Sequence, residues 1–176
     1  MADATLQATK PADLTARVVT QPGQIIRGIP SFLFSVPRGW ELDEAPDALA
    51  VVRTPQEVDG FWVNAIISHD RVARAIDFEK AAKVTWARLK QSSPDATSSF
   101  EKMARFGTNV VYLRGAELTA PKSGRALGQL HALFFAPALD EGKTVDFFQV
   151  VATAPADRME QFAAPFLEII GSFRFT

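Results

Sequence analysis

The feature that most constrains this fold is a run of long segments in the second half of the chain, joined by short loops. Most of these segments are rich in Val, Leu and Phe, which favour β-strands, and the loops carry the Gly, Pro, Asp and Ser that are typical of turns. The four segments are 98–106, 110–119, 125–136 and 143–153. Because short loops join neighbouring antiparallel strands, the pattern predicts a four-stranded meander.

These strands do not alternate strictly between apolar and polar residues. The runs Val110-Val111-Tyr112-Leu113 and Phe147-Phe148 place apolar side chains on both faces. An antiparallel sheet with one face open to water alternates cleanly instead. The sequence therefore predicts that both faces are covered, and that helices supply much of the cover.

Two segments have the period of an amphipathic helix. The first begins after Asp77, a favourable N-cap, and runs over 78–91, with Trp86 in its apolar stripe. The second covers 159–170 and leads into a short strand at 172–176. We expect both helices to pack their apolar stripes on the sheet.

Three β-rich segments come before the first helix, at 31–36, 48–54 and 61–68, and the last two are predicted to form a hairpin. The fold class is therefore α+β, with a central antiparallel sheet of about six to seven strands flanked by helices on both faces. Residues 1–24 are polar without a sustained period and are predicted to form a flexible arm. The remaining residues, 25–176, are predicted to form a single domain.

Composition excludes several classes of function. The chain has no Cys, two His and a net charge of −1. It can form neither disulfides nor thiolate–zinc sites, and it lacks the basic excess that nucleic acids or anionic membrane surfaces require. We predict no metal and no cofactor.

The predicted location follows from hydropathy. No segment approaches the ~20 apolar residues of a spanning helix, so membrane insertion is not expected. The N-terminal sequence has no apolar signal core and no lipid-accepting Cys. The sequence as written predicts a cytoplasmic protein, and a removed N-terminal signal would instead place it in the cell envelope.

Polar side chains that interrupt apolar strands are the candidate ligand-binding residues, because burying them costs free energy unless they are paired. A four-residue loop at 121–124 places Arg114 opposite His131. If Pro137 lies opposite Lys143 across the next turn, His131 lies opposite Gln149. Arg114, His131 and Gln149 then form a polar row on one face. The candidates are Arg114, His131, Gln149, Asn64 and Gln129.

Such a row could orient a ligand that carries hydroxyl or carboxylate groups. Its alternatives are a solvated stripe beyond the covering helix and a buried hydrogen-bonded network. No Ser or Asp has a recognisable catalytic spacing to His131, and the G-x-S-x-G motif is missing from the sequence. The second histidine, His69, is expected at the surface near the end of a strand.

Three features together resemble one family. They are the motif Val36-Pro37-Arg38-Gly39-Trp40, the hairpin–helix–meander order, and a final helix that leads into Ser172-Phe173-Arg174-Phe175. This layout resembles the PsbP-like α/β/α fold, in its bacterial LpqN/LpqT-type branch. The resemblance implies a central sheet with helices on both faces, used mainly for binding and assembly.

Relatives of that fold include photosystem accessory proteins, a nuclear-import factor that binds a small GTPase, and bacterial envelope lipoproteins. The bacterial branch is typically exported and anchored through a Cys, which this sequence lacks. The resemblance supplies no catalytic residue to transfer, and a shared fold does not by itself define function.

The leading hypothesis is a non-enzymatic binding or accessory domain that engages a protein partner or a small polar ligand at a cleft between sheet and helix. The first alternative is a small hydrolase-like enzyme that uses His131 with Arg114. The second is a structural homodimer subunit that associates through an exposed strand edge.

Overall fold

The computed structural model describes residues 28–138 and 142–176, and the predicted arm at 1–24 lies outside them. Seven strands form the main sheet: β2 (Glu41–Asp43), β3 (Ala50–Arg53), β4 (Asn64–Ala73), β5 (Thr97–Phe106), β6 (Asn109–Thr119), β7 (Ala126–Phe135) and β8 (Thr144–Pro155). Their spatial order is β2-β3-β4-β8-β7-β6-β5, and every neighbouring pair is antiparallel. The predicted fold class, hairpin and meander are confirmed.

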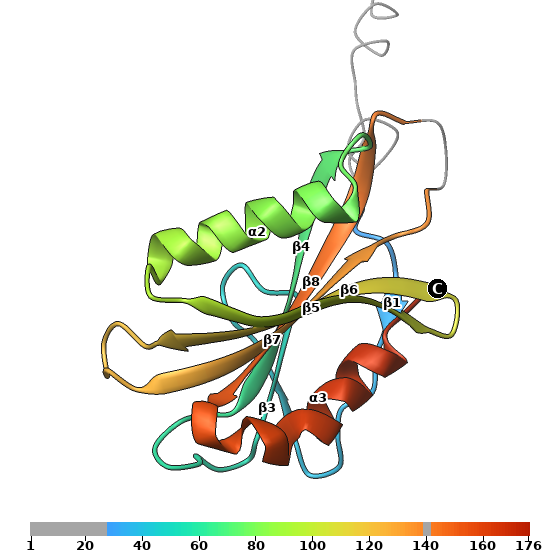
Figure 1. The fold of residues 1–176 in the computed structure, drawn as a ribbon. Helices are drawn as coiled ribbons and strands as arrows, with labels where there is room; N and C mark the ends of the chain where they lie inside the picture. The colour runs from blue at the N-terminus through green and yellow to red at the C-terminus, as the bar shows by residue number, and fades with distance from the viewer. Residues whose placement is uncertain (1–27, 139–141) are drawn as a thin grey trace, which may run out of the picture.

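Two helices lie on opposite faces of this sheet (Figure 1). Helix α2 (Phe78–Ser92) begins at the predicted N-cap, where the Asp77 carboxylate accepts a hydrogen bond of 2.9 Å from the backbone N–H of Lys80. Helix α3 (Met159–Ser172) follows the short 3₁₀ turn η1 (Ala156–Arg158). Within residues 28–138 and 142–176, neither length nor apolar character qualifies any helix to cross a membrane.

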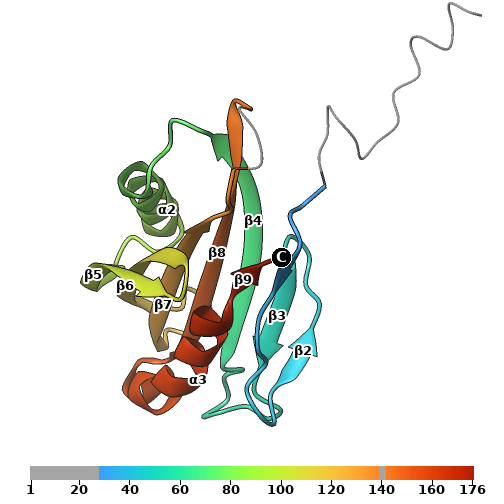
Figure 2. The ribbon, with the colours of Figure 1, turned by 90° about the vertical axis from the view of Figure 1, so that its right-hand side faces the viewer.

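The larger core lies between α3 and the sheet. Phe166, Ile169 and Ile170 of α3 are fully buried there. The small second sheet, formed by β1 (Phe32–Leu33) and β9 (Arg174–Phe175), closes this core beside α3 (Figure 2). The rings of Phe32 and Phe175 both lie with their centres 5.3 Å from that of Phe173. Burial of this aromatic cluster fixes the C-terminal segment against the sheet.

Helix α2 packs on the opposite face of the sheet over a smaller core than α3 does. Tyr112, Leu133 and Phe147 pack against the buried alanines of α2. Trp86 is partly buried and packs near Leu118, as expected for the apolar stripe of this helix. Figure 2 shows α2 at the β5–β7 end of the sheet, while β2 and β3 lie at the other end. Ile66 of β4 is accordingly 38% exposed. Helices therefore cover both faces, but α2 leaves part of its face open.

Three details of the N-terminal half differ from prediction. The segment predicted as a strand at 31–36 contributes only Phe32 and Leu33, which pair with β9 and not with the main sheet. Strand β2 was not predicted. Trp40 follows the Pro-Arg-Gly turn and was expected from the sequence to plug the edge of the sheet. Its ring instead packs against Phe166 of α3, with ring centres 5.9 Å apart.

Candidate functional site

The five predicted site residues share the α2 face of four adjacent strands. Arg114 lies opposite His131, as predicted. The prediction that His131 faces Gln149 is wrong, because His131 pairs with Val151 and Gln149 pairs with Leu133. A shift of two residues keeps a side chain on the same face, and Gln149 Nε2 still lies 3.2 Å from His131 Nδ1.

His131 is the centre of a buried amide network. Its Nε2 lies 2.8 Å from Oε1 of Gln129, and Nε2 of Gln129 donates to the Thr153 hydroxyl at 3.3 Å. The residue is only 8% exposed, and this burial, with the nearby charge of Arg114, lowers the pKa of His131 to about 4. The ring is therefore neutral near pH 7, donating to Gln129 and accepting from Gln149.

Arg114 joins α2 to strands β5 and β6. Its Nε and Nη2 atoms each lie 3.0 Å from Oε1 of Glu101, and Nη1 donates to the backbone oxygen of Ala82 in α2 at 3.1 Å. Nη2 also donates to the Tyr112 hydroxyl at 2.8 Å, and the guanidinium lies 4.7 Å from the ring centre of Trp86. Every guanidinium nitrogen thus has a partner within the fold, and Arg114 holds the helix on the sheet.

The two side chains beside Arg114 have shifted ionisation. A hydrogen bond from Tyr112 and the charge of Arg114 lower the pKa of Glu101 below its usual value. Burial, with the Glu101 carboxylate beside it, raises the pKa of Tyr112 to about 12. Near neutral pH this end of the row therefore contains a carboxylate, a guanidinium and a neutral phenol.

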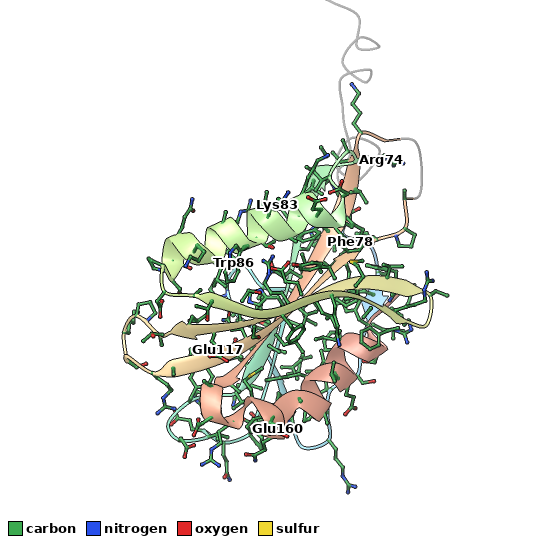
Figure 3. All side chains as sticks on the ribbon, viewed as in Figure 1. Arg74, Phe78, Lys83, Trp86, Glu117 and Glu160 are labelled. Atoms are coloured by element: carbon green, nitrogen blue, oxygen red, sulfur yellow. The ribbon has the colours of Figure 1, made fainter. Side chains whose placement is uncertain are left out.

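A cavity of about 330 Å³ opens beside Arg114, between α2 and β5. Phe78 and Trp86 lie on the side of α2 that faces the sheet, and Lys83 lies further round the helix (Figure 3). The residues that line the cavity are Phe78, Glu79, Ala82, Lys83, Glu101, Lys102, Met103, Tyr112 and Arg114. Its lining is mainly apolar, and charged side chains of both signs surround it, so it suits a ligand that carries both apolar and polar groups.

Asn64 lies at the far end of the row, three strands from Arg114. It pairs with Thr153 across β4 and β8, and its Nδ2 donates to the backbone oxygen of Trp62 at 2.7 Å. Its Oδ1 is buried and has no hydrogen-bond partner among the described residues. Since adjacent strands lie about 4.8 Å apart, Asn64 and Arg114 cannot hold the same end of a small ligand.

A second cavity, which was not predicted from the sequence, lies on the opposite face between α3 and strands β5, β6 and β7. Its volume is about 340 Å³. Two glycines form its floor: a Cβ on Gly115 would lie 2.5 Å from the Phe100 ring, and a Cβ on Gly128 would clash with Cγ of Met159. The signal in the sequence was a glycine inside each of two long strands, which indicates close approach of another group.

The walls of this α3 groove are mainly apolar, and its rim is charged. Phe100 of β5 and Leu167 of α3 are 43% and 42% exposed, so large apolar side chains remain accessible to solvent. Glu117 from β6 and Glu160 from α3 belong to the rim, together with Lys102 (Figure 3). An accessible apolar groove with a polar rim is typical of a binding site for a ligand or a partner.

His69 does not lie free at the surface near the end of a strand. It sits within β4, with its Nε2 atom 2.8 Å from Oδ1 of Asp146 and its ring centre 4.9 Å from that of Phe148. Arg71 Nη2 contacts the same carboxylate oxygen at 2.9 Å. In the part of the chain that the structure describes, no group of three His, Asp or Glu residues is placed to hold a metal ion.

Comparison with known proteins identifies the fold. No family model matches the chain, and no curated protein sequence matches it. LpqN of Mycobacterium tuberculosis, described as involved in cell envelope biogenesis, superposes with a TM-score of 0.68 at 19% identity, over 85% of this chain and 86% of LpqN.

Two further structures share the fold. Cyanobacterial PsbP (CyanoP) of Synechocystis superposes with a TM-score of 0.56 at 16% identity, over 85% of this chain and 95% of CyanoP. The Ran-binding protein Mog1p of Saccharomyces cerevisiae superposes with a TM-score of 0.51 at 16% identity, over 82% of this chain and 89% of Mog1p. The chain thus has the PsbP-like α/β/α fold that the sequence resemblance predicted.

Proposed function

We propose that this chain is a non-enzymatic binding domain that receives an apolar segment of a protein partner in the α3 groove. The observation that carries the proposal is the groove itself, which leaves Phe100 and Leu167 accessible above a glycine floor. Its volume lies at the lower end of the usual range for ligand pockets, about 300–1,000 Å³. That space fits one or two large apolar side chains of a partner.

The fold comparison supports a protein partner. Mog1p has the same fold and is a Ran-binding protein, so the architecture can present a surface to another protein. The chemistry of the row on the other face supports binding over catalysis. His131 is neutral and has both ring nitrogens in hydrogen bonds to glutamine amides, which leaves neither nitrogen free to accept a proton from a substrate.

The test is site-specific photocrosslinking followed by reconstitution. A benzoylphenylalanine at Leu167 should crosslink the partner in cells, whereas the same group at Val84, a similarly exposed position on α2, should not. The crosslinked protein is then identified and purified, and its binding is measured by calorimetry.

Filling the groove separates this site from any other surface. Ala163→Trp places an indole among the lining residues and should weaken the purified partner's binding at least ~10-fold, whereas Ala163→Ser should bind as the unchanged protein does. Circular dichroism checks that both variants fold. A folded Ala163→Trp variant with unchanged affinity would rule out the α3 groove as the site.

A second candidate function is recognition of a small polar ligand on the α2 face. The observation that favours it is the cavity of about 330 Å³ beside Arg114. The proposed binding residues are Arg114, His131, Gln149, Asn64 and Gln129. Native mass spectrometry of the purified, unchanged protein should then show a retained small molecule. The His131→Ala variant should lose that molecule without unfolding. If the unchanged protein and the variant both show only the mass of the protein, this candidate is rejected.

A further inference from the structure

Strand β5 is the last strand of the seven-stranded sheet, and no strand of the described residues pairs with its outer edge. It is ten residues long, and most of its residues are exposed. Long edge strands are normally shortened, covered or kept apart by charge, because their free backbone groups pair with other strands. Here the only irregularity is a register shift between Ser98 and Phe100, near the start of the strand.

The hairpin that joins β5 to β6 determines which backbone groups are free. Phe106 pairs with Asn109 across the two-residue loop Gly107-Thr108. Residues that flank a two-residue loop form a hydrogen-bonded pair, and such pairs recur at every second position. Phe106 and alternate residues before it therefore bond to β6. The residues whose N–H and C=O groups point to the open edge are Glu101, Met103 and Arg105.

We propose that two copies of this chain pair antiparallel along β5, about a two-fold axis at Met103. The two seven-stranded sheets then continue as one. The axis is perpendicular to the sheet, so both α2 helices lie on one face and both α3 helices on the other. This inference goes beyond the proposed function, since it needs no occupant in the α3 groove.

Charge complementarity selects this register. With the axis at Met103, Glu101 of each copy lies directly opposite Arg105 of the other, which gives two symmetric ion pairs on the α2 face. An axis at Lys102 would set two ammonium groups opposite each other, and axes at Glu101 or Arg105 would likewise oppose like charges. An axis at Ala104 would set Glu101 opposite a glycine. Only the Met103 register pairs every Glu101 with an Arg105.

The two charged groups are available for these pairs. Arg105 is exposed and has no ion-pair partner elsewhere in residues 28–138 and 142–176. Glu101 already contacts Arg114 through Oε1, but its side chain remains half exposed. The intramolecular pair therefore holds the carboxylate at the edge, where a second copy can reach it.

The same register buries exposed apolar groups. Met103 is 51% exposed on the α2 face and would pack against Met103 of the second copy. Phe100 is 43% exposed on the α3 face and would lie opposite Phe106 of the second copy. Large apolar side chains on a free strand edge favour association when the edge also offers unpaired backbone groups.

Because the chain has no Cys, a single introduced Cys tests the position of the two-fold axis directly. In a hydrogen-bonded antiparallel pair the two Cα atoms lie about 5.5 Å apart, within the range of a disulfide. Met103→Cys should therefore form a disulfide-linked dimer in a glutathione redox buffer. Val84→Cys, at a similarly exposed position on α2, should remain monomeric under the same conditions.

Sedimentation velocity tests the unmodified interface. The unchanged protein should show a concentration-dependent dimer between about 1 and about 100 µM. Arg105→Glu would place two carboxylates opposite each other at each pair, so it should raise the dimer dissociation constant at least ~10-fold. Lys122→Glu makes the same change of charge in a loop away from the edge and should leave that constant unchanged. A protein that stays monomeric throughout, or a dimer that is insensitive to Arg105→Glu, would overturn the proposal. Ala163→Trp leaves the β5 edge unchanged, so failure here is distinguishable from failure of the groove proposal.

Discussion

Acidification from pH 7.5 to pH 5 should destabilise this protein through His131. Burial lowers the pKa of His131 from 6.5 to about 4 in the folded chain, whereas the unfolded chain regains the ordinary value. Between these two values the unfolded state binds more protons, so the free energy of unfolding falls as the pH falls. The full difference corresponds to about 3 kcal/mol, and about 2 kcal/mol of it is lost by pH 5.

Urea unfolding at 25 °C, followed by circular dichroism at both pH values, measures this loss. The chain has only one other histidine, so His69→Gln is the matched control. His131→Gln should remove most of the pH dependence, because glutamine can still hydrogen-bond but cannot take up a proton. His69→Gln should retain the dependence that arises from His131. Equal pH dependence in the unchanged protein and in His131→Gln would refute the reasoning.

Three further outcomes follow from the packing. Tyr112 is the only tyrosine, so absorbance at 295 nm measures its ionisation directly. In the folded protein it should ionise near pH 12, and in urea near pH 10. A folded-state pKa near 10 would contradict the burial argument. Phe173→Ala removes a fully buried ring from the aromatic cluster and should cost about 3–5 kcal/mol in urea unfolding. Gly128→Ala forces Met159 away from the sheet and should lower the free energy of unfolding by about 1–3 kcal/mol. A decrease below about 0.5 kcal/mol would count against a rigid groove floor.

Local signals determined what the sequence could predict. Asp77 and the apolar stripe behind it defined α2, because an N-cap and a helical period act within a few residues. The loop at 121–124 was short enough to fix the register of β6 against β7, and Arg114 lies opposite His131 as a result. The predicted register of β7 against β8 was wrong because β7 ends at Phe135 and β8 begins only at Thr144, and a separation of this length does not determine pairing.

Strand β2 could not have been predicted from its own residues. Its sequence, Glu41-Leu42-Asp43, lacks the β-branched and aromatic side chains that favour strands. It is held by pairing with β3 and by Arg53, whose guanidinium contacts both Glu41 and Asp43 at 2.9 Å. That contact is between segments separated by a loop, and no local pattern encodes it.

The candidate site was predicted only in part, because part of it depends on contacts between distant segments. Alternation along each strand placed the polar row on one face, and a register error of two residues did not change that face. The α3 groove, in contrast, depends on how α3 crosses β6 and β7. Gly128 matters because Met159, at the start of α3, packs over it. Gly115 matters because the ring of Phe100, its partner on β5, lies over it. Such contacts join distant segments and leave only a weak trace in the sequence.

Strand β5 contributes to both cavities and to the proposed dimer edge, so these functions must be linked. Phe100 lines the α3 groove, whereas Glu101 on the opposite face lines the cavity beside Arg114. By thermodynamic reciprocity, a partner that changes the dimer affinity must have its own affinity changed by dimerisation. A partner that binds only in the groove leaves the free backbone groups of Met103 unoccupied. It should leave the dimer intact and change its affinity only through Phe100, which lines the groove and also packs in the dimer. A partner that adds a strand to β5 should instead compete with dimerisation, and sedimentation with the purified partner would show the dimer dissociating as that partner is added.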